Sequence, residues 1–200
     1  MNGRRFFPIL LWLAAAAFPA SAGERNRVDL QFAAGTAFAM QGARSDTDTS
    51  GFQAGGRFDL TAGALFADSA AIHFGLRGEV LSPSAFDGDR NLKGYASVGP
   101  QFAFFYRGKA AVTESLTVMP GFQAGASLLL GKYSLIENRF FYPTFDAAVF
   151  CDLRPTALPL TSVRIFIPFS AAFRRDVPVC LGSGIGIAVL FDHFLPSTRF

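Results

Sequence analysis

The feature that most constrains this 200-residue chain is a two-residue alternation between apolar and small or polar side chains. In its first occurrence Leu30 and Phe32 share one face, and Gln31 lies on the other. Alternation with this period predicts a β-strand whose two faces meet different surroundings. The pattern occurs eight times, over 28–40, 52–63, 72–80, 95–106, 116–130, 141–152, 163–174 and 184–192. The sequence therefore predicts eight strands separated by turn-rich segments.

The first 22 residues have the pattern of a secretory signal peptide. Arg4 and Arg5 precede an apolar run over 6–18, and small residues at 20–22 form a cleavage motif. The run is shorter than the roughly 20 residues that a spanning helix needs. We therefore expect cleavage after Ala22 and one domain over 23–200. Of the 18 Lys and Arg residues two leave with the signal, so 16 basic residues face 15 acidic ones. This balance gives no case for a nucleic-acid partner.

The composition of the remaining chain indicates a sheet that crosses a membrane. Half of all residues are hydrophobic and 24 are phenylalanine, but no stretch after the signal peptide reaches the length of a spanning helix. Eight strands can close a barrel whose interior is filled by side chains. Alternating segments of about ten residues between turns are the signature of outer-membrane barrels. The predicted fold is an all-β, eight-stranded antiparallel up-and-down transmembrane β-barrel.

The alternation would also suit a soluble, lipocalin-like barrel whose apolar face points inward. The opposite face argues against this, because it carries mainly Gly, Ala, Gln and Ser with isolated charges. An Arg or Lys facing lipid at the bilayer midplane would cost about 2–4 kcal/mol. We therefore expect the charged and amide side chains to line the lumen. They are Arg57, Asp59, Arg77, Glu79, Gln101, Gln123, Asp146, Arg164 and Asp192, with Asp29 and Asp152 on the same face.

Opposite charges in so narrow a lumen are expected to pair, since an unpaired buried charge is costly. The main hypothesis is thus a plugged interior, and the alternative is a proton or solute path lined by Arg57, Arg77 and Glu79. Pro100 and Pro168 fall inside expected strands, and we expect bulges or shifted strand ends there.

The last segment also contains glycines and a proline that affect its structure. Gly184 and Gly186 are expected to thin the inner face, so that neighbouring side chains can fill the barrel. Pro196 interrupts the segment. The last strand therefore either ends near His193, or starts later and runs to Phe200.

The sequence offers little support for catalysis or metal binding. Neither His73 nor His193 has a neighbouring serine in a recognisable motif, so we expect no catalytic residue and no enzymatic activity. Cys151 and Cys180 are expected near opposite ends of the barrel as unpaired thiols. Two histidines and two cysteines without clustering give no metal site, and no cofactor is expected.

The mature chain resembles the small eight-stranded outer-membrane proteins of Gram-negative bacteria, a group that includes OmpW, OmpX and the membrane domain of OmpA. The sequence-specific part of the resemblance is the last strand with its terminal phenylalanine. It is similar to the signal that the barrel-assembly machinery reads, which would comprise Ile187, Val189, Phe191 and Phe200. The resemblance implies a bacterial outer-membrane location and contact with outer-membrane lipid.

Members of this group have different implied roles. The OmpW-like branch is implied to pass small hydrophobic molecules into the membrane, the OmpX-like branch to adhere through protruding strands, and the OmpA-like branch to act structurally. Loops expected around 41–51, 81–93, 132–139 and 174–181 are short, which weakens adhesion, whereas the apolar content favours hydrophobic transport. We therefore expect an OmpW-like monomer with small hydrophobic solutes as partners; the alternative is a structural or surface-interaction role.

Overall fold

The computed structural model describes residues 27–41, 51–67, 69–82, 94–133, 139–173 and 179–194. The expected signal peptide at 1–22 and the terminal Phe200 lie outside the described residues. The described residues form one antiparallel sheet of ten strands. They are β1 (Arg27–Gln41), β2 (Gly51–Ala67), β3 (Ala70–Leu81), β4 (Tyr95–Arg107), β5 (Ala111–Val112), β6 (Leu116–Tyr133), β7 (Arg139–Pro155), β8 (Thr161–Ala172), β9 (Cys180–Ser183) and β10 (Gly186–Phe194).

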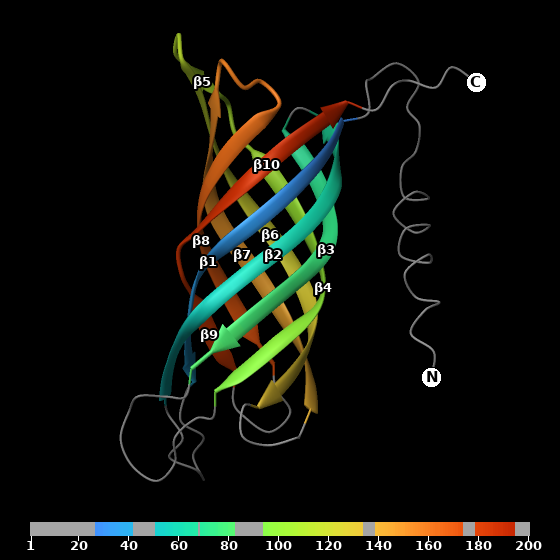
Figure 1. The fold of residues 1–200 in the computed structure, drawn as a ribbon, viewed down its shortest axis with the longest axis vertical. Helices are drawn as coiled ribbons and strands as arrows, with labels where there is room; N and C mark the ends of the chain where they lie inside the picture. Colours follow the sequence, from blue (N-terminus) through green and yellow to red (C-terminus); the bar gives the residue numbers. More distant parts are fainter. Residues whose placement is uncertain are drawn as a thin grey trace, which may run out of the picture.

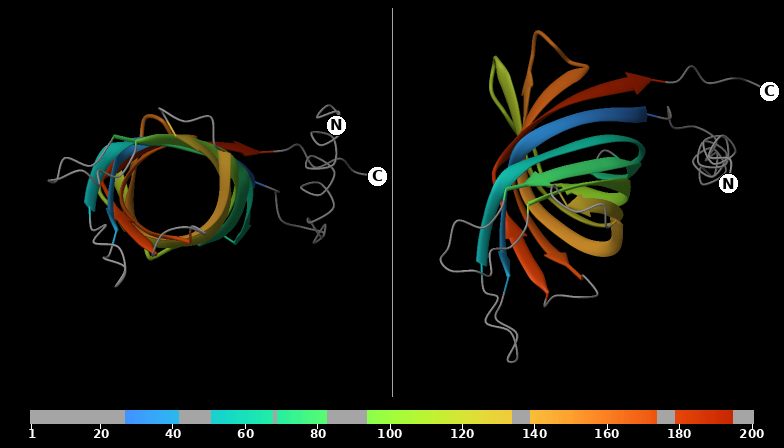
Figure 2. Two further views of the ribbon diagram at one scale, coloured as in Figure 1. Left: turned by 90° about the horizontal axis from the view of Figure 1, so that it is seen from below. Right: turned by 60° about the horizontal axis from the view of Figure 1, so that its bottom comes forward.

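The sheet closes into a ring, which Figure 2 shows from below. Each long strand pairs with its sequence neighbours, and β1 closes the ring by pairing with both β9 and β10. These two short strands are parts of one strand, because the pairs Gly35↔Gly186 and Phe38↔Ser183 keep the same register with β1. β5 pairs with β6 off this path. The predicted eight-stranded up-and-down barrel is therefore confirmed.

The two ends of the barrel differ in what they carry. β1 begins and β10 ends at the top of Figure 1, where β5 and the β7–β8 turn also lie. We call this the terminal end, and the opposite end the loop end. Because the strands alternate in direction, Arg107 at the end of β4 and Arg154 near the end of β7 both lie at the terminal end.

The outer wall of the barrel is apolar and the interior is polar. Large apolar side chains on the long strands are exposed, among them Phe58 at 50%, Phe145 at 60% and Ile187 at 58%. The intervening side chains are buried and include many polar and charged ones. This arrangement is the reverse of a soluble barrel, and it suits a wall that contacts lipid. The described part of the chain contains no helix long and apolar enough to cross a membrane.

The prolines disturb the strands less than expected. Pro168 in β8 pairs with β7, and Pro100 in β4 pairs with β3, without a shift of register. The pairing of β4 with β6 omits Gly99 and Pro100 and then resumes in the same register. The expected bulges or shifted ends are therefore wrong at both prolines, because each missing N–H is absorbed by a local gap in pairing.

Several strands extend further than the alternation suggested. β4 reaches Arg107 and β7 reaches Pro155, beyond the predicted ends at 106 and 152. The last strand is described as far as Phe194, and residues 195–200, on which its two alternative ends depend, lie outside the described residues. The longer β4 and β7 bring two additional arginines into the barrel.

Candidate functional site in the lumen and the wall

The nine residues predicted to line the lumen all lie on the inner face of the barrel. Glu79 is partly buried, and the other eight are buried: Arg57, Asp59, Arg77, Gln101, Gln123, Asp146, Arg164 and Asp192. The charged members fall into two groups, separated along the barrel axis. The group nearer the loop end is held by β2, β3 and β7, and the other by strands that meet at the terminal end.

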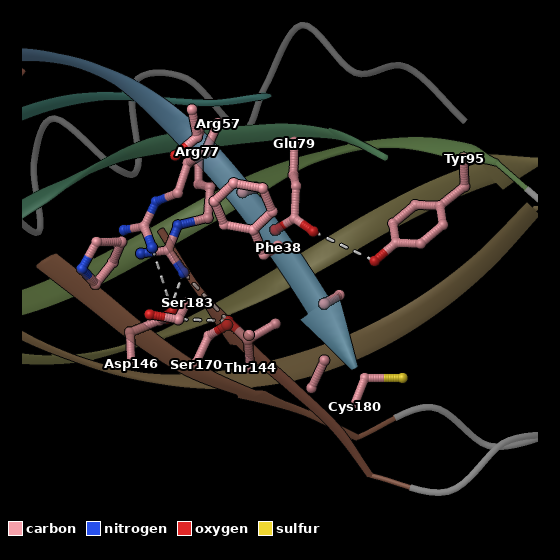
Figure 3. A pocket seen from close by; sticks show the side chains of 16 residues that line it. Phe38, Arg57, Arg77, Glu79, Tyr95, Thr144, Asp146, Ser170, Cys180 and Ser183 are labelled. Carbon is pink, nitrogen blue, oxygen red and sulfur yellow. Dashed lines mark hydrogen bonds and ion pairs between the residues drawn. The ribbon is translucent and has the colours of Figure 1, made fainter. Parts of the chain in front are cut away.

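The loop-end cluster comprises Arg57, Asp59, Arg77, Thr144 and Asp146, and Figure 3 labels all of these except Asp59. The Asp59 carboxylate binds both arginines, with Oδ2 2.8 Å from Arg57 Nη2 and Oδ1 3.0 Å from Arg77 Nε. Arg77 also pairs with Asp146, whose Oδ2 accepts a hydrogen bond of 3.0 Å from the Thr144 hydroxyl. Each buried charge here has an opposite partner, which the cost of burying a lone charge requires.

A small cavity lies beside this cluster, towards the loop end. Its lining includes Thr36, Arg57, Glu79 and Asp146, and its volume is about 30 Å³. The Tyr95 hydroxyl donates to Glu79 Oε1 at 3.3 Å on the same side of the barrel (Figure 3). A cavity of this volume with polar walls holds about one or two water molecules. The lumen described here therefore has no open aqueous channel at this level.

The terminal-end cluster comprises Asp29, His73, Arg107, Asp152, Arg154, Arg164 and Asp192. Asp152 accepts hydrogen bonds from Arg107 Nε at 2.9 Å and from Arg164 Nε at 2.6 Å. Arg107 Nη2 also reaches Asp29 Oδ2 at 3.0 Å, and Arg154 pairs with Asp192. Arg107 thus joins β4 to both β1 and β7 across the lumen.

Aromatic rings also fill the lumen at the level of the terminal-end cluster. The guanidinium carbon of Arg164 lies 3.7 Å from the ring centroid of Phe150 and 4.6 Å from that of Phe105. Its side chain is 1% exposed. Cation–π contacts are strongest when the cation is desolvated. The Arg164 side chain therefore fills the space between the two rings.

The buried His73 is also part of the terminal-end cluster. Its Nδ1 lies 3.1 Å from the Thr61 hydroxyl, and its Nε2 lies 3.7 Å from Asp29 Oδ2. Its ring also packs on Phe105, with 4.4 Å between the centroids. These contacts give it a structural position in the core. The side chain of His193 is not among those that the structure describes.

Sequence reasoning missed Arg107 and Arg154, which it assigned to turns. Both continue the inward-facing positions of their strands: Arg107 follows Ala103 and Phe105 at two-residue spacing, and Arg154 follows Asp152. The alternation therefore places both arginines on the inner face, but the turn-forming residues that follow each arginine favoured a turn instead.

The residues expected to form the assembly signal lie on the outer wall where they are described. Ile187 and Phe191 are exposed and Val189 is partly exposed. Phe200 lies outside the described residues. Cys151 and Cys180 lie on β7 and β9 and form no disulfide. Among the described residues no group of three or more His, Cys, Asp or Glu could hold a metal ion.

The wall is interrupted in its last strand. Gly184 and Ile185 separate β9 from β10, and neither residue is paired in the ladders to β1 and β8. The register places Pro168, which has no N–H, opposite this gap in β8. On the β1 side Thr36 spans it: the Thr36 N–H donates to Ile185 O at 2.9 Å, and its hydroxyl accepts from Ile185 N at 3.1 Å.

The two glycines beside the gap have different reasons to be there. A Cβ at Gly186 would clash with the ring of Phe166, which fills the space over the inner face as the sequence predicts. A Cβ at Gly184 would instead clash with the backbone oxygen of Thr36. Gly184 therefore permits the close approach of β1 to the interrupted strand.

An apolar groove runs along the outer wall at the same place. It is lined by Phe32, Ala34, Gly35, Thr36, Ile165, Ile185 and neighbouring residues of β10, and its volume is about 840 Å³. Thr36 lines both this groove and the small cavity of the lumen. At the interruption, Thr36 thus borders both the interior and the lipid-facing surface of the seam between β1 and the last strand.

At the sequence level, no protein-family model and no curated protein matches the chain. Solved structures do resemble it. Neisserial surface protein A has a TM-score of 0.58 and 13% identity, with 82% of this chain and 96% of that chain covered. The outer-membrane protein AlkL in lipid bilayers has a TM-score of 0.44 and 10% identity, covering 92% and 98%. Ail, the attachment invasion locus protein of Yersinia pestis, has a TM-score of 0.37 and 12% identity, covering 84% and 100%.

These similarities concern the fold. The comparison with Neisserial surface protein A supports a small outer-membrane barrel over most of the chain. None of the three matches assigns the chain to the OmpW-like branch, which stays a prediction.

Proposed function

We propose that this protein, a β-barrel of the bacterial outer membrane, passes small apolar molecules sideways through its wall, at the seam between β1 and the last strand. The proposal keeps the OmpW-like role expected from the sequence and locates its route. The observation that carries it is the meeting of the lumen cavity and the apolar groove at Thr36. Short turns mark the periplasmic side of such barrels, so the loop end would face outward and receive the solute.

The filled lumen argues for a sideways route. A solute moving along the axis would have to displace the terminal-end cluster, in which Asp152 alone holds Arg107 and Arg164. Breaking one buried ion pair costs about 3–5 kcal/mol. At the seam the ladder is already absent at Gly184 and Ile185, and among the described residues hydrogen bonds of Thr36 span the gap on the β1 side. Each such bond contributes about 0.5–1.5 kcal/mol.

The groove suits an apolar solute. Pockets of about 300–1,000 Å³ lined by apolar side chains hold small molecules, and the groove volume of about 840 Å³ lies within this range. Its lining is formed mainly by Phe, Ala, Gly, Ile and Val side chains. The small cavity of the lumen must widen before it admits such a solute, so the route operates only when the seam opens.

A structural or surface-interaction role is the second candidate. The observation in its favour is the same set of paired charges, because a lumen sealed at two levels needs no transported solute to explain it. The loops at 42–50, 83–93, 134–138 and 174–178, which an interaction role would use, lie outside the described residues.

A cross-link across the seam separates these candidates. In a background with Cys151→Ser and Cys180→Ser, Thr36→Cys and Ile185→Cys place two thiols opposite each other on the outer wall. Entry of a small apolar fluorophore into proteoliposomes is then measured with the pair oxidised and reduced. We expect the reduced protein to speed entry over empty liposomes, and oxidation to abolish this gain.

The matched control is the pair Met40→Cys and Leu181→Cys, which also joins β1 to the last strand but lies within the regular ladder and outside the groove. Its oxidation should leave entry unchanged. Equal entry through the oxidised Thr36–Ile185 pair would reject the route, and a wild-type barrel that gives no gain over empty liposomes would reject transport in favour of the second candidate.

A further inference from the structure

Two buried aspartates face each other where the barrel closes. Asp29 of β1 and Asp192 of β10 are direct partners in the ladder, and their side chains are 0% and 6% exposed. Like charges directly opposite each other in a sheet destabilise it. The penalty is larger at a buried site, because the surroundings screen charge less than bulk water does.

In each of the two carboxylates the Oδ2 atom faces charged partners, and the Oδ1 atom does not. Asp29 Oδ2 faces Arg107 Nη2 at 3.0 Å and His73 Nε2 at 3.7 Å, and Asp192 Oδ2 pairs with Arg154. The Oδ1 atoms of both aspartates are buried and have no hydrogen-bond donor among the described residues. Directly opposite residues of an antiparallel pair have Cβ atoms about 4.5–5.5 Å apart, so the carboxyl groups of Asp29 and Asp192 are neighbours on the inner face.

The surrounding charges do not remove this conflict. The charged and titratable groups packed around the pair are His73 on β3, Arg107 on β4, Asp152 and Arg154 on β7, and Arg164 on β8. Three arginines face three aspartates, but Arg164 directs its bonds to Asp152 and Gln31. Arg107 is shared between Asp29 and Asp152.

We propose that Asp29 and Asp192 share one proton between their Oδ1 atoms, and that this proton makes closure of the barrel depend on pH. A single O–H···O bond would satisfy both orphan oxygens and remove one of the two facing charges. Carboxyl pairs at such close range hold a proton that isolated carboxyls release. The barrel is then held shut at its seam by a proton that the periplasmic end can exchange.

The sign of the pH dependence follows from counting protons. An ordinary aspartate releases its proton near pH 4, so above that pH the unfolded chain lacks a proton that the folded pair retains. Stability therefore falls as pH rises, with the unfolding constant growing about tenfold per pH unit. The dependence ends at the pH where the folded pair also loses its proton, and the curve is flat above it.

The test is urea unfolding of the full-length mature barrel in detergent micelles, followed by gel mobility and circular dichroism between pH 5 and pH 9. Wild type should lose stability over part of this range. Asp192→Asn should be flat, since its amide donates to Asp29 Oδ1 at every pH. The matched control Asp59→Asn removes a buried carboxylate of the loop-end cluster, lowers stability at every pH, and should keep the wild-type slope.

A slope that persists in Asp192→Asn would overturn the proposal. So would a wild-type barrel whose stability at high pH is restored by a divalent cation, because the orphan oxygens would then hold a metal ion. If Asp192→Asn fails to fold, infrared spectroscopy replaces it. The C=O band of a protonated carboxyl should be present in wild type at neutral pH, and its absence would equally reject the shared proton.

Discussion

At the residue scale, the interior of the barrel depends on carboxylates that each hold more than one arginine. Asp59 binds Arg57 and Arg77, and Asp152 binds Arg107 and Arg164. An ionised carboxylate has two acceptor oxygens, so one aspartate can accept hydrogen bonds from two guanidinium groups. The four pairs therefore link strands β2, β3, β4, β7 and β8 through only two acidic side chains, and loss of one acid affects several strands.

Replacing Asp152 with alanine should be among the most destabilising single changes in the lumen. It leaves Arg107 with one carboxylate partner and Arg164 with none, and removing one partner of a buried pair costs about 3–5 kcal/mol. Urea unfolding of the detergent-solubilised barrel measures this loss. The control Glu114→Gln lies on the exposed β5–β6 turn, and its effect should stay within about 0.5 kcal/mol. Equal stability of the two variants would mean that the Asp152 network does not support the fold.

At the element scale, the last strand of the wall is divided into two short strands, β9 and β10. Its two halves keep one register with β1, yet Gly184 and Ile185 are unpaired in the ladders. The hydroxyl of Thr36 takes the place of a backbone acceptor for the Ile185 N–H. A side chain on the lipid-facing side thus completes the ladder at the gap.

Thr36→Val should loosen this join while keeping the shape of the side chain. The Ile185 N–H loses its acceptor, which should lower the free energy of unfolding by about 1 kcal/mol. Amide hydrogen exchange at Ile185 should become faster, while exchange at Leu190 within the regular ladder should not change. Thr36→Ser retains the hydroxyl and should behave as wild type; faster exchange in that variant would show that the methyl group, not the hydroxyl, closes the gap.

At the element scale, the sequence predicted the strands of the barrel but not all of their ends. Alternation predicted the number of strands and the face on which residues such as Arg77 and Asp146 lie, because a strand has no other way to separate apolar from polar side chains. It did not predict the ends of β4 and β7, so Arg107 and Arg154 were missed. The sequence also did not predict that Asp29 and Asp192 face each other, since this pairing depends on the register between the first and last strands.

At the scale of the whole molecule, the barrel combines a lumen filled with paired charges and an interruption in the last strand of its wall. Two charged clusters and the rings around Arg164 lie in the interior, and a cavity beside the loop-end cluster has a volume of about 30 Å³. Exposed apolar side chains cover the outside. The proposed sideways route would separate movement of ions from movement of apolar molecules, because water does not favour an apolar route.

Conductance of the purified wild-type barrel in a planar lipid bilayer tests the closed lumen most directly. The barrel is inserted at neutral pH in symmetric salt, and the current is recorded under an applied voltage. We predict no current steps on the scale of a general porin, because the clusters around Asp59 and Asp152 block the axis. Stable steps of porin size from folded, heat-modifiable protein would contradict the account.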